Sequence, residues 1–316
     1  MHLLTVLTTL FTLAYAVTRI VPPEGAIVVS KKSCHGHFTT VQAAVDSLST
    51  TSKSEQSIFI DRGVYEEQVL IPQRSAKLTV YGYTTDTTNY EANEVSITFN
   101  ISSPEAGGND QSGTVRVLSA DTHLYNLNIA NTFGKGAQAV ALSAQNDKQG
   151  YYGVKLTGYQ DTLLSNTGDQ FYSRSLITGR TDFIFGARAR SWFEACDIGA
   201  VTADGNGYVT ALGRDSETNP AFYLFNNCRV AAAPGEQPPP PSNTEMSDVV
   251  NPAGWTVWRA GDSPDDLEFG EYNNSGPGSV GPRASFTQKL TAPVKIGTVL
   301  DNYASWVDPA FLQGTA

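Results

Sequence analysis

The chain has 316 residues and a formal net charge of −10, with 40% hydrophobic and only 16% charged residues. This composition excludes an intrinsically disordered chain, because it supplies enough apolar surface for a large core. It also argues against a coiled coil, which is rich in charged residues. The acidic charge argues against a nucleic-acid partner, since such proteins carry a basic surface. At about 150 residues per domain, the length alone predicts two domains.

The N-terminus has the features of a secretory signal peptide. An apolar run from Leu3 to Leu13 precedes Ala14-Tyr15-Ala16, a small-x-small cleavage site. The run is too short to span a bilayer, and no later segment is long and apolar enough to do so. We therefore expect residues 1–16 to be removed and residues 17–316 to be secreted, with no membrane partner. A buried N-terminal strand is the alternative. Two N-x-S sequons are compatible with secretion: Asn100 and Asn273.

Cysteine and histidine are too scarce for a disulfide framework or a metal centre. The three cysteines are Cys34, Cys196 and Cys228, and no pair has C-x-x-C spacing. No metal site is therefore expected. Cys196 and Cys228 occupy equivalent positions in the repeat described next. Because adjacent parallel positions fit disulfide geometry poorly, we expect two buried thiols rather than a bridge.

A short pattern recurs through the middle of the chain. An aromatic or apolar residue is followed, three and five residues later, mainly by apolar residues or Cys, and a turn residue often follows. A repeat of about 21 residues cannot bury its apolar face alone, so copies must stack. Because no helix pattern intervenes, stacking predicts an all-β, parallel β-helix forming one solenoid domain. An antiparallel sandwich is the alternative, but it lacks a fixed period. The copies begin at Leu124, Tyr151, Tyr172, Phe193 and Phe225.

Both ends of this solenoid need a cover. Residues 39–48 place Val41, Ala44, Val45 and Leu48 at helical spacing behind a threonine N-cap. We expect a short helix here that caps the first coil. The segment from Tyr303 to Leu312 is expected to form the second cap.

Two aspartates stand at equivalent positions in adjacent repeats. Asp161 lies ten residues after Tyr151, and Asp182 lies ten residues after Tyr172. Stacking would bring them to within about 4.8 Å of each other. Two carboxyl groups this close resist simultaneous ionisation, so one would hold a proton and the other would be free to act as base or nucleophile. The alternatives are solvated or capping aspartates, or a calcium site.

An arginine is expected beside this pair. Arg214 follows Asp182 by 32 residues, which matches the longest interval of the repeat. It would then lie one coil from Asp182, close enough to keep that carboxylate ionised.

The ordered set of motifs around these residues resembles the pectin methylesterases, and most closely their secreted fungal members. The resemblance covers nearly all of the chain after residue 16, and it implies a single-stranded right-handed parallel β-helix. The motifs are Gly63-Val64-Tyr65-Glu66-Glu67, Gln138 to Leu142, Gly158 to Leu163, Asp182 to Gly186, Leu212-Gly213-Arg214, Gly254-Trp255 with Trp258, and Glu271-Tyr272-Asn273 before Gly276-Pro277-Gly278.

The resemblance also implies residue roles. Asp182 matches the nucleophile, Asp161 the general acid and base, and Arg214 the residue that orients the nucleophile. Gln138 and Gln160 match the residues that stabilise the oxyanion. The implied substrate is methyl-esterified homogalacturonan, hydrolysed by a monomer without a metal or organic cofactor.

One position departs from the family pattern. The family continues Leu-Gly-Arg with Pro and Trp, whereas here Asp215 and Ser216 follow Arg214. A sugar-stacking tryptophan is therefore missing. The remaining candidates for substrate contact are aromatic, and for them core packing is an equal alternative: Tyr159, Phe185, Trp255 and Trp258.

Other functions fit the residues less well. A pectate-lyase-like enzyme would need a calcium-binding carboxylate cluster and leaves the two glutamines unexplained. A polygalacturonase-type hydrolase needs Gly-His-Gly, and a serine esterase needs Gly-x-Ser-x-Gly, and neither motif occurs. A non-catalytic carbohydrate-binding solenoid remains the alternative from a different class, favoured only by the change at Ser216.

Overall fold

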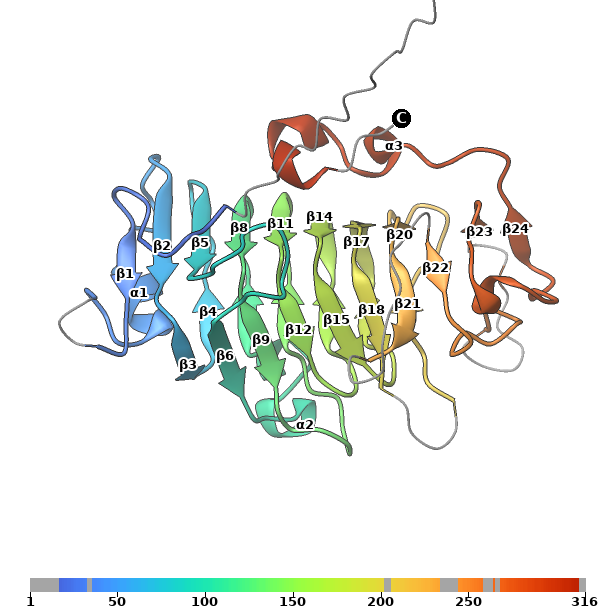
Figure 1. The fold of residues 1–316 in the computed structure, drawn as a ribbon, viewed down its shortest axis with the longest axis horizontal. Coiled ribbons are helices and arrows are strands. Elements are labelled where there is room, and N and C mark those ends of the chain that lie inside the picture. The colour runs from blue at the N-terminus through green and yellow to red at the C-terminus, as the bar shows by residue number, and fades with distance from the viewer. Residues whose placement is uncertain are drawn as a thin grey trace, which may run out of the picture.

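The strands of the chain wind into a stack of coils (Figure 1). The computed structural model describes residues 17–32, 36–201, 206–233, 244–257, 264 and 268–312. Three parallel sheets run along the stack, and nearly every coil contributes one strand to each sheet in the same order. This is a parallel β-helix, so the predicted all-β solenoid is confirmed.

The sheets are numbered here in the order in which a coil visits them. The first sheet contains β1 (Ile27–Val29), β2 (Gln56–Ile60), β5 (Leu78–Gly82), β8 (Thr122–Tyr125), β11 (Gln149–Tyr152), β14 (Thr167–Ser173), β17 (Arg188–Glu194) and β20 (Phe222–Asn226). The second sheet contains β3 (Gly63–Glu66), β6 (Val95–Phe99), β9 (Asn128–Asn131), β12 (Lys155–Thr157), β15 (Leu176–Gly179), β18 (Asp197–Ala200), β21 (Arg229–Ala232) and β22 (Glu245–Met246). The third sheet contains β4 (Val69–Ile71), β7 (Val115–Val117), β10 (Leu142–Ala144), β13 (Leu163–Ser165), β16 (Ile184–Gly186) and β19 (Thr210–Leu212). Outside the stack, β23 (Phe269–Glu271) pairs with β24 (Thr287–Lys289).

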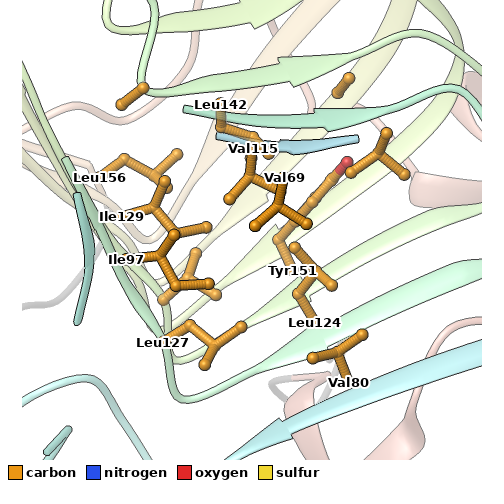
Figure 2. Close-up of a cluster of buried hydrophobic side chains, with 14 of the residues drawn as sticks. Val69, Val80, Ile97, Val115, Leu124, Leu127, Ile129, Leu142, Tyr151 and Leu156 are labelled. Atoms are coloured by element: carbon orange, nitrogen blue, oxygen red, sulfur yellow. The ribbon is translucent and has the colours of Figure 1, made fainter. Parts of the chain in front are cut away.

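The register of the first sheet confirms the repeat. Tyr151 is aligned with Leu124 in the coil before it and with Tyr172 in the coil after it. The column continues through Phe193 to Phe225, and its four aromatic rings stack with centroids 4.8, 4.7 and 4.6 Å apart. Stacked rings of this kind add to the burial energy of the core. Figure 2 shows the aliphatic part of the same core, filled by side chains from all three sheets.

A short helix covers the first coil, as predicted. Helix α1 (Val41–Ser47) buries Val41 and Val45 against the stack, and Thr40 Oγ1 accepts a hydrogen bond from the first turn. The carboxylate of Glu67 accepts two further backbone N–H groups of that turn, at 2.8 and 2.9 Å. These bonds satisfy donors that a helix N-terminus otherwise leaves unpaired.

The other helices of the described residues are single turns: α2 (Ser103–Ala106), α3 (Ile296–Val299) and the 3₁₀ turns Asp110–Ser112, Pro277–Ser279, Tyr303–Ser305 and Pro309–Phe311. In this part of the chain, no helix has the length and apolar character needed to cross a membrane.

The C-terminal segment does not cap the end of the stack, so that prediction was wrong. It runs along the outer face of the first sheet, above β8, β11 and β14 (Figure 1). Trp306 and Phe311 pack there against Tyr152 and Phe171, and Tyr152 Oη and Asp308 N are hydrogen-bonded at 3.0 Å. These outward aromatic rings make the flank apolar, which is why the segment lies along it.

Two cysteines stack in neighbouring coils without a bridge. Cys196 and Cys228 are both free and buried, which confirms the expectation of two thiols. Burial raises the pKa of the Cys228 thiol well above its ordinary value, so it is a packing residue. Cys34 lies outside the described residues.

Candidate active site

The site is built at the corner where each coil passes from the second sheet to the third. Asp161 and Asp182 each stand two residues before a strand of the third sheet, and those strands pair Leu163 with Ile184. The two aspartates therefore occupy the same corner of adjacent coils, as their spacing predicted. Both have left-handed backbone conformations, with φ of 62° and 49°. Aspartate is one of the few side chains that tolerates this conformation.

Backbone hydrogen bonds tie the corner together across three coils. The amide of Asp161 donates to the carbonyl of Thr181 at 3.1 Å, and the amide of Ala139 donates to the carbonyl of Gln160 at 3.1 Å. Gln138 and Gln160 thereby flank the aspartates. Among the described residues, neither glutamine side-chain amide has a hydrogen-bond partner, so both are available as donors.

Both carboxyl groups are buried and poorly hydrogen-bonded. Asp161 is 5% exposed and Asp182 is 7% exposed. The one side-chain donor near Asp161 is Asn109 Nδ2, at 3.4 Å from Oδ2. Oδ1 of Asp182 has no partner within the described part of the chain. A buried carboxylate without donors is costly, so both groups favour the neutral form.

The two protonation states differ. Burial, and then the charge of Asp182, raises the pKa of Asp161 to about 7. The pKa of Asp182 is also raised, but by burial alone. Because Asp161 keeps its proton while Asp182 ionises, the two carboxylates are not charged together in acidic solution. The pair thus supplies a proton donor and an anion side by side.

The predicted ion pair between Arg214 and Asp182 is absent from the described residues. The prediction assumed an interval of 32 residues, which holds in the first sheet, where Phe193 pairs with Phe225. In the third sheet Ile184 pairs with Thr210, only 26 residues later. Arg214 is therefore carried past the level of Asp182. Its Nη2 donates to the carbonyl of Glu217 at 3.4 Å, and its buried Nε has no partner.

The chain was compared with known proteins at this point. The family model described as Pectinesterase matches residues 26–243. Pectinesterases from Aspergillus niger and Aspergillus aculeatus are 42% and 43% identical, over 95% and 94% of this chain and 96% of each relative. The crystal structure of the pectin methylesterase from Aspergillus niger matches with a TM-score of 0.85 and 37% identity, covering 93% of this chain and 100% of that chain.

The chain belongs to the pectinesterase family.

The aromatic side chains expected to contact substrate lie in different settings. Phe185 follows the corner on β16, half-buried and on the opposite face from the core residue Ile184. Tyr159 is half-buried just before the corner, and its carbonyl accepts the amide of Arg180 at 2.6 Å. Both fit a pectinesterase substrate surface. Trp255 instead packs on Phe269, with centroids 5.0 Å apart, and donates to Glu271 at 3.0 Å. Trp258 lies outside the described residues.

A residue that the sequence did not reveal joins this pectinesterase site. Asn109 lies between α2 and the 3₁₀ turn Asp110–Ser112, and its Oδ1 accepts from Ser103 Oγ at 2.6 Å. That bond directs Nδ2 toward Asp161. The sequence carries a signal for α2, the capping box formed by Ser102 and Glu105. It carries none for a contact between residues 52 positions apart.

No group of three or more histidine, cysteine, aspartate or glutamate side chains suited to a metal ion occurs among the described residues.

Proposed function

We propose that this site hydrolyses methyl esters of galacturonate units in homogalacturonan, the methyl-esterified polymer of pectin, and releases methanol. The observation that carries the proposal is the buried aspartate pair in which Asp161 holds a proton and Asp182 does not. An esterified substrate also suits the acidic protein, because the methyl groups remove the polymer charge that would repel a net charge of −10.

In the first step, a carboxylate oxygen of Asp182 attacks the carbonyl carbon of the ester. The carbonyl oxygen becomes an oxyanion, and the free side-chain amides of Gln138 and Gln160 donate hydrogen bonds to it. The bond to the methoxy group then breaks. Asp161 gives its proton to the departing oxygen, so methanol leaves and the sugar stays bound to Asp182 as an anhydride.

In the second step, water cleaves this intermediate. Asp161 is now a carboxylate and takes a proton from the water molecule that attacks the acyl carbon. The bond between the acyl carbon and Asp182 breaks, which releases the sugar carboxylate and restores both aspartates. The proposed steps use no metal or organic cofactor. They are also written without Arg214, whose orienting role remains a prediction from the resemblance.

Methanol release from highly methylated pectin tests the proposal. We compare the wild type with Asp182→Asn and Asp161→Asn, and use Asp46→Asn, a change at an exposed aspartate of α1, as the matched control. Both site variants should lose activity while the control retains it. A folded wild type that releases no methanol, or that makes unsaturated uronides instead, contradicts the proposal.

We also propose that residues 1–16 are a leader and that the protein acts outside the cell as a monomer, without nucleic acid or membrane as partner. The carbonyl of Val17 already accepts the amide of Thr87 at 2.8 Å, so the fold begins where the predicted cleavage ends. N-terminal sequencing of the protein from culture medium and light scattering on a sizing column test these points. A retained leader or a dimer overturns them.

A further inference from the structure

A recess of about 200 Å³ lies on the outer face of the second sheet. Three neighbouring strands of the stack, β6, β9 and β12, form its floor; Figure 1 shows them side by side. The mechanism proposed above uses none of its side chains. The lining residues are Ser96, Thr98, Asn128, Ile129, Ala130, Lys155 and Thr157.

The recess exists because the sheet is covered on one side of it and bare on the other. The outward row that contains Asn128 and Lys155 continues to Leu176, which is only 1% exposed although it faces away from the core. A segment that includes Tyr90 lies near this point, since Tyr90 Oη donates to Asp197 at 2.7 Å. Short side chains such as Ala130 line the uncovered part, so the surface there is low.

Polar groups without protein partners line the recess. Within the described part of the chain, the ammonium group of Lys155 has no hydrogen bond or ion pair, and the hydroxyls of Thr98 and Thr157 have no hydrogen bond. Asn128 is held in place, because its Nδ2 donates to Asn93 and to Ser96, both at 3.3 Å. The recess therefore offers one cation and two free hydroxyls on a fixed floor.

No lining residue is a carboxylate, although the protein as a whole is acidic. The nearest acid along the row of Lys155 is Asp197, two strands away, and Arg229 neutralises it with a bond of 2.8 Å. Glu66 stands on the other side, aligned with Thr98 on the outer strand β3. The charge of Lys155 is thus left for a ligand, and the matching ligand is a single carboxylate that also carries hydroxyl groups.

We propose that the recess is a second carbohydrate site, which binds a galacturonate unit whose methyl ester has been removed. Lys155 pairs with the carboxylate, and Thr98 and Thr157 bond to sugar hydroxyls. An esterified unit has no charge for Lys155, so the site distinguishes product from substrate. Thr157 precedes the catalytic acid Asp161 by four residues on the same coil, which keeps de-esterified polymer on the enzyme. The identity of the ligand rests on the proposed function.

Protection of lysines from acetylation tests the site directly. The full chain carrying Asp182→Asn is treated with an amine-reactive acetylating reagent, alone, with oligogalacturonate, and with the fully methyl-esterified oligomer. Mass spectrometry then measures the rate at each lysine. Lys289, exposed on β24 and without an ion pair among the described residues, is the internal control. Oligogalacturonate should slow acetylation of Lys155 several-fold and leave Lys289 unchanged, and the esterified oligomer should protect neither.

A binding measurement completes the test. Lys155→Gln should weaken oligogalacturonate binding about tenfold, the loss expected for one charge-assisted bond, whereas Lys289→Gln should not. Equal acetylation of Lys155 in all samples, or equal protection by both oligomers, overturns the proposal. Methanol released by the Asp182→Asn protein would instead contradict the nucleophile assignment, so the two failures are distinguishable.

Discussion

Two corners of each coil contain left-handed residues, and they treat polar groups in opposite ways. Between the first and second sheets, Asn126 has φ of 52° and is fully buried, and its side chain is satisfied by Arg19 at 2.9 Å and by the carbonyl of Asn89 at 2.8 Å. Between the second and third sheets, Asp161 and Asp182 have the same backbone conformation, yet their carboxyl groups lack such partners.

The difference shows what each corner is for. A satisfied amide at a tight turn holds neighbouring coils together. An unsatisfied carboxyl group costs stability, and such groups persist at sites where their altered pKa serves a reaction. One corner therefore stabilises the solenoid, and the other uses part of that stability for reactivity.

The largest effect should come from removing the nucleophile. Asp182→Asn should lower the rate of methanol release by at least about a thousandfold. It should leave the free energy of unfolding unchanged or raise it, because an unsatisfied buried acid is removed. Methanol assays and thermal denaturation on the same preparation measure both. A variant that is active, or clearly less stable, would show that this corner is structural like the other.

Asp161→Asn should reduce methanol release by about a hundredfold or more, because the leaving group then receives no proton. The remaining activity should no longer depend on the ionisation of residue 161. Rates measured from pH 4 to 9 check this result. A variant that keeps the pH profile of the wild type would remove Asp161 from the role of acid.

The opposite outcome is expected at the satisfied corner. Asn126→Ala should destabilise the fold by about 2 kcal/mol, since it leaves Arg19 unpaired and places alanine at a left-handed position. The activity of the folded fraction should not change. Asn227→Ala, at the same corner with φ of 52° and a part-exposed side chain, is the matched control and should cost less. Denaturant unfolding measures both changes.

The pH dependence of stability should also differ between the corners. The pKa of Asp161 is raised to about 7, above the value of about 3.9 for an unfolded aspartate. The folded state therefore binds the proton more tightly, and its contribution to stability is complete below pH 4 and is lost as pH rises to 7. Unfolding of the wild type and of Asp161→Asn across this range should show a decline that is weaker in the variant. Parallel curves would contradict the raised pKa.

The smallest effect is expected at Asn109. Asn109→Ala removes a long hydrogen bond to the carboxylate form of Asp161, so the alkaline limit of activity should move to higher pH, with a change in maximal rate below about tenfold. Asn109→Asp reverses the polarity of the contact and should move that limit further in the same direction. An unchanged pH profile in both variants would mean that Asn109 only packs.

The sequence determined the features that repeat. The column from Leu124 through Tyr151 to Phe225 reports its own register, because stacking needs the same side chain at the same place in each coil. The interval of 21 residues between Asp161 and Asp182 likewise placed them together. The helix over Val41–Ser47 followed from local periodicity and a cap, which act within one turn.

Only the tertiary structure decided what breaks the repeat. The longest interval gains its extra residues partly before and partly after β19, so Arg214 misses Asp182 although the total of 32 is right. The C-terminal segment lies along the first sheet because Tyr152 and Phe171 face outward there, and strand alternation alone does not reveal what covers an outward ring. Asn109 and the recess at Lys155 likewise depend on side chains that meet across coils. Stacking fixes register between equivalent residues, but insertions and covering segments are placed by the packing of the whole molecule.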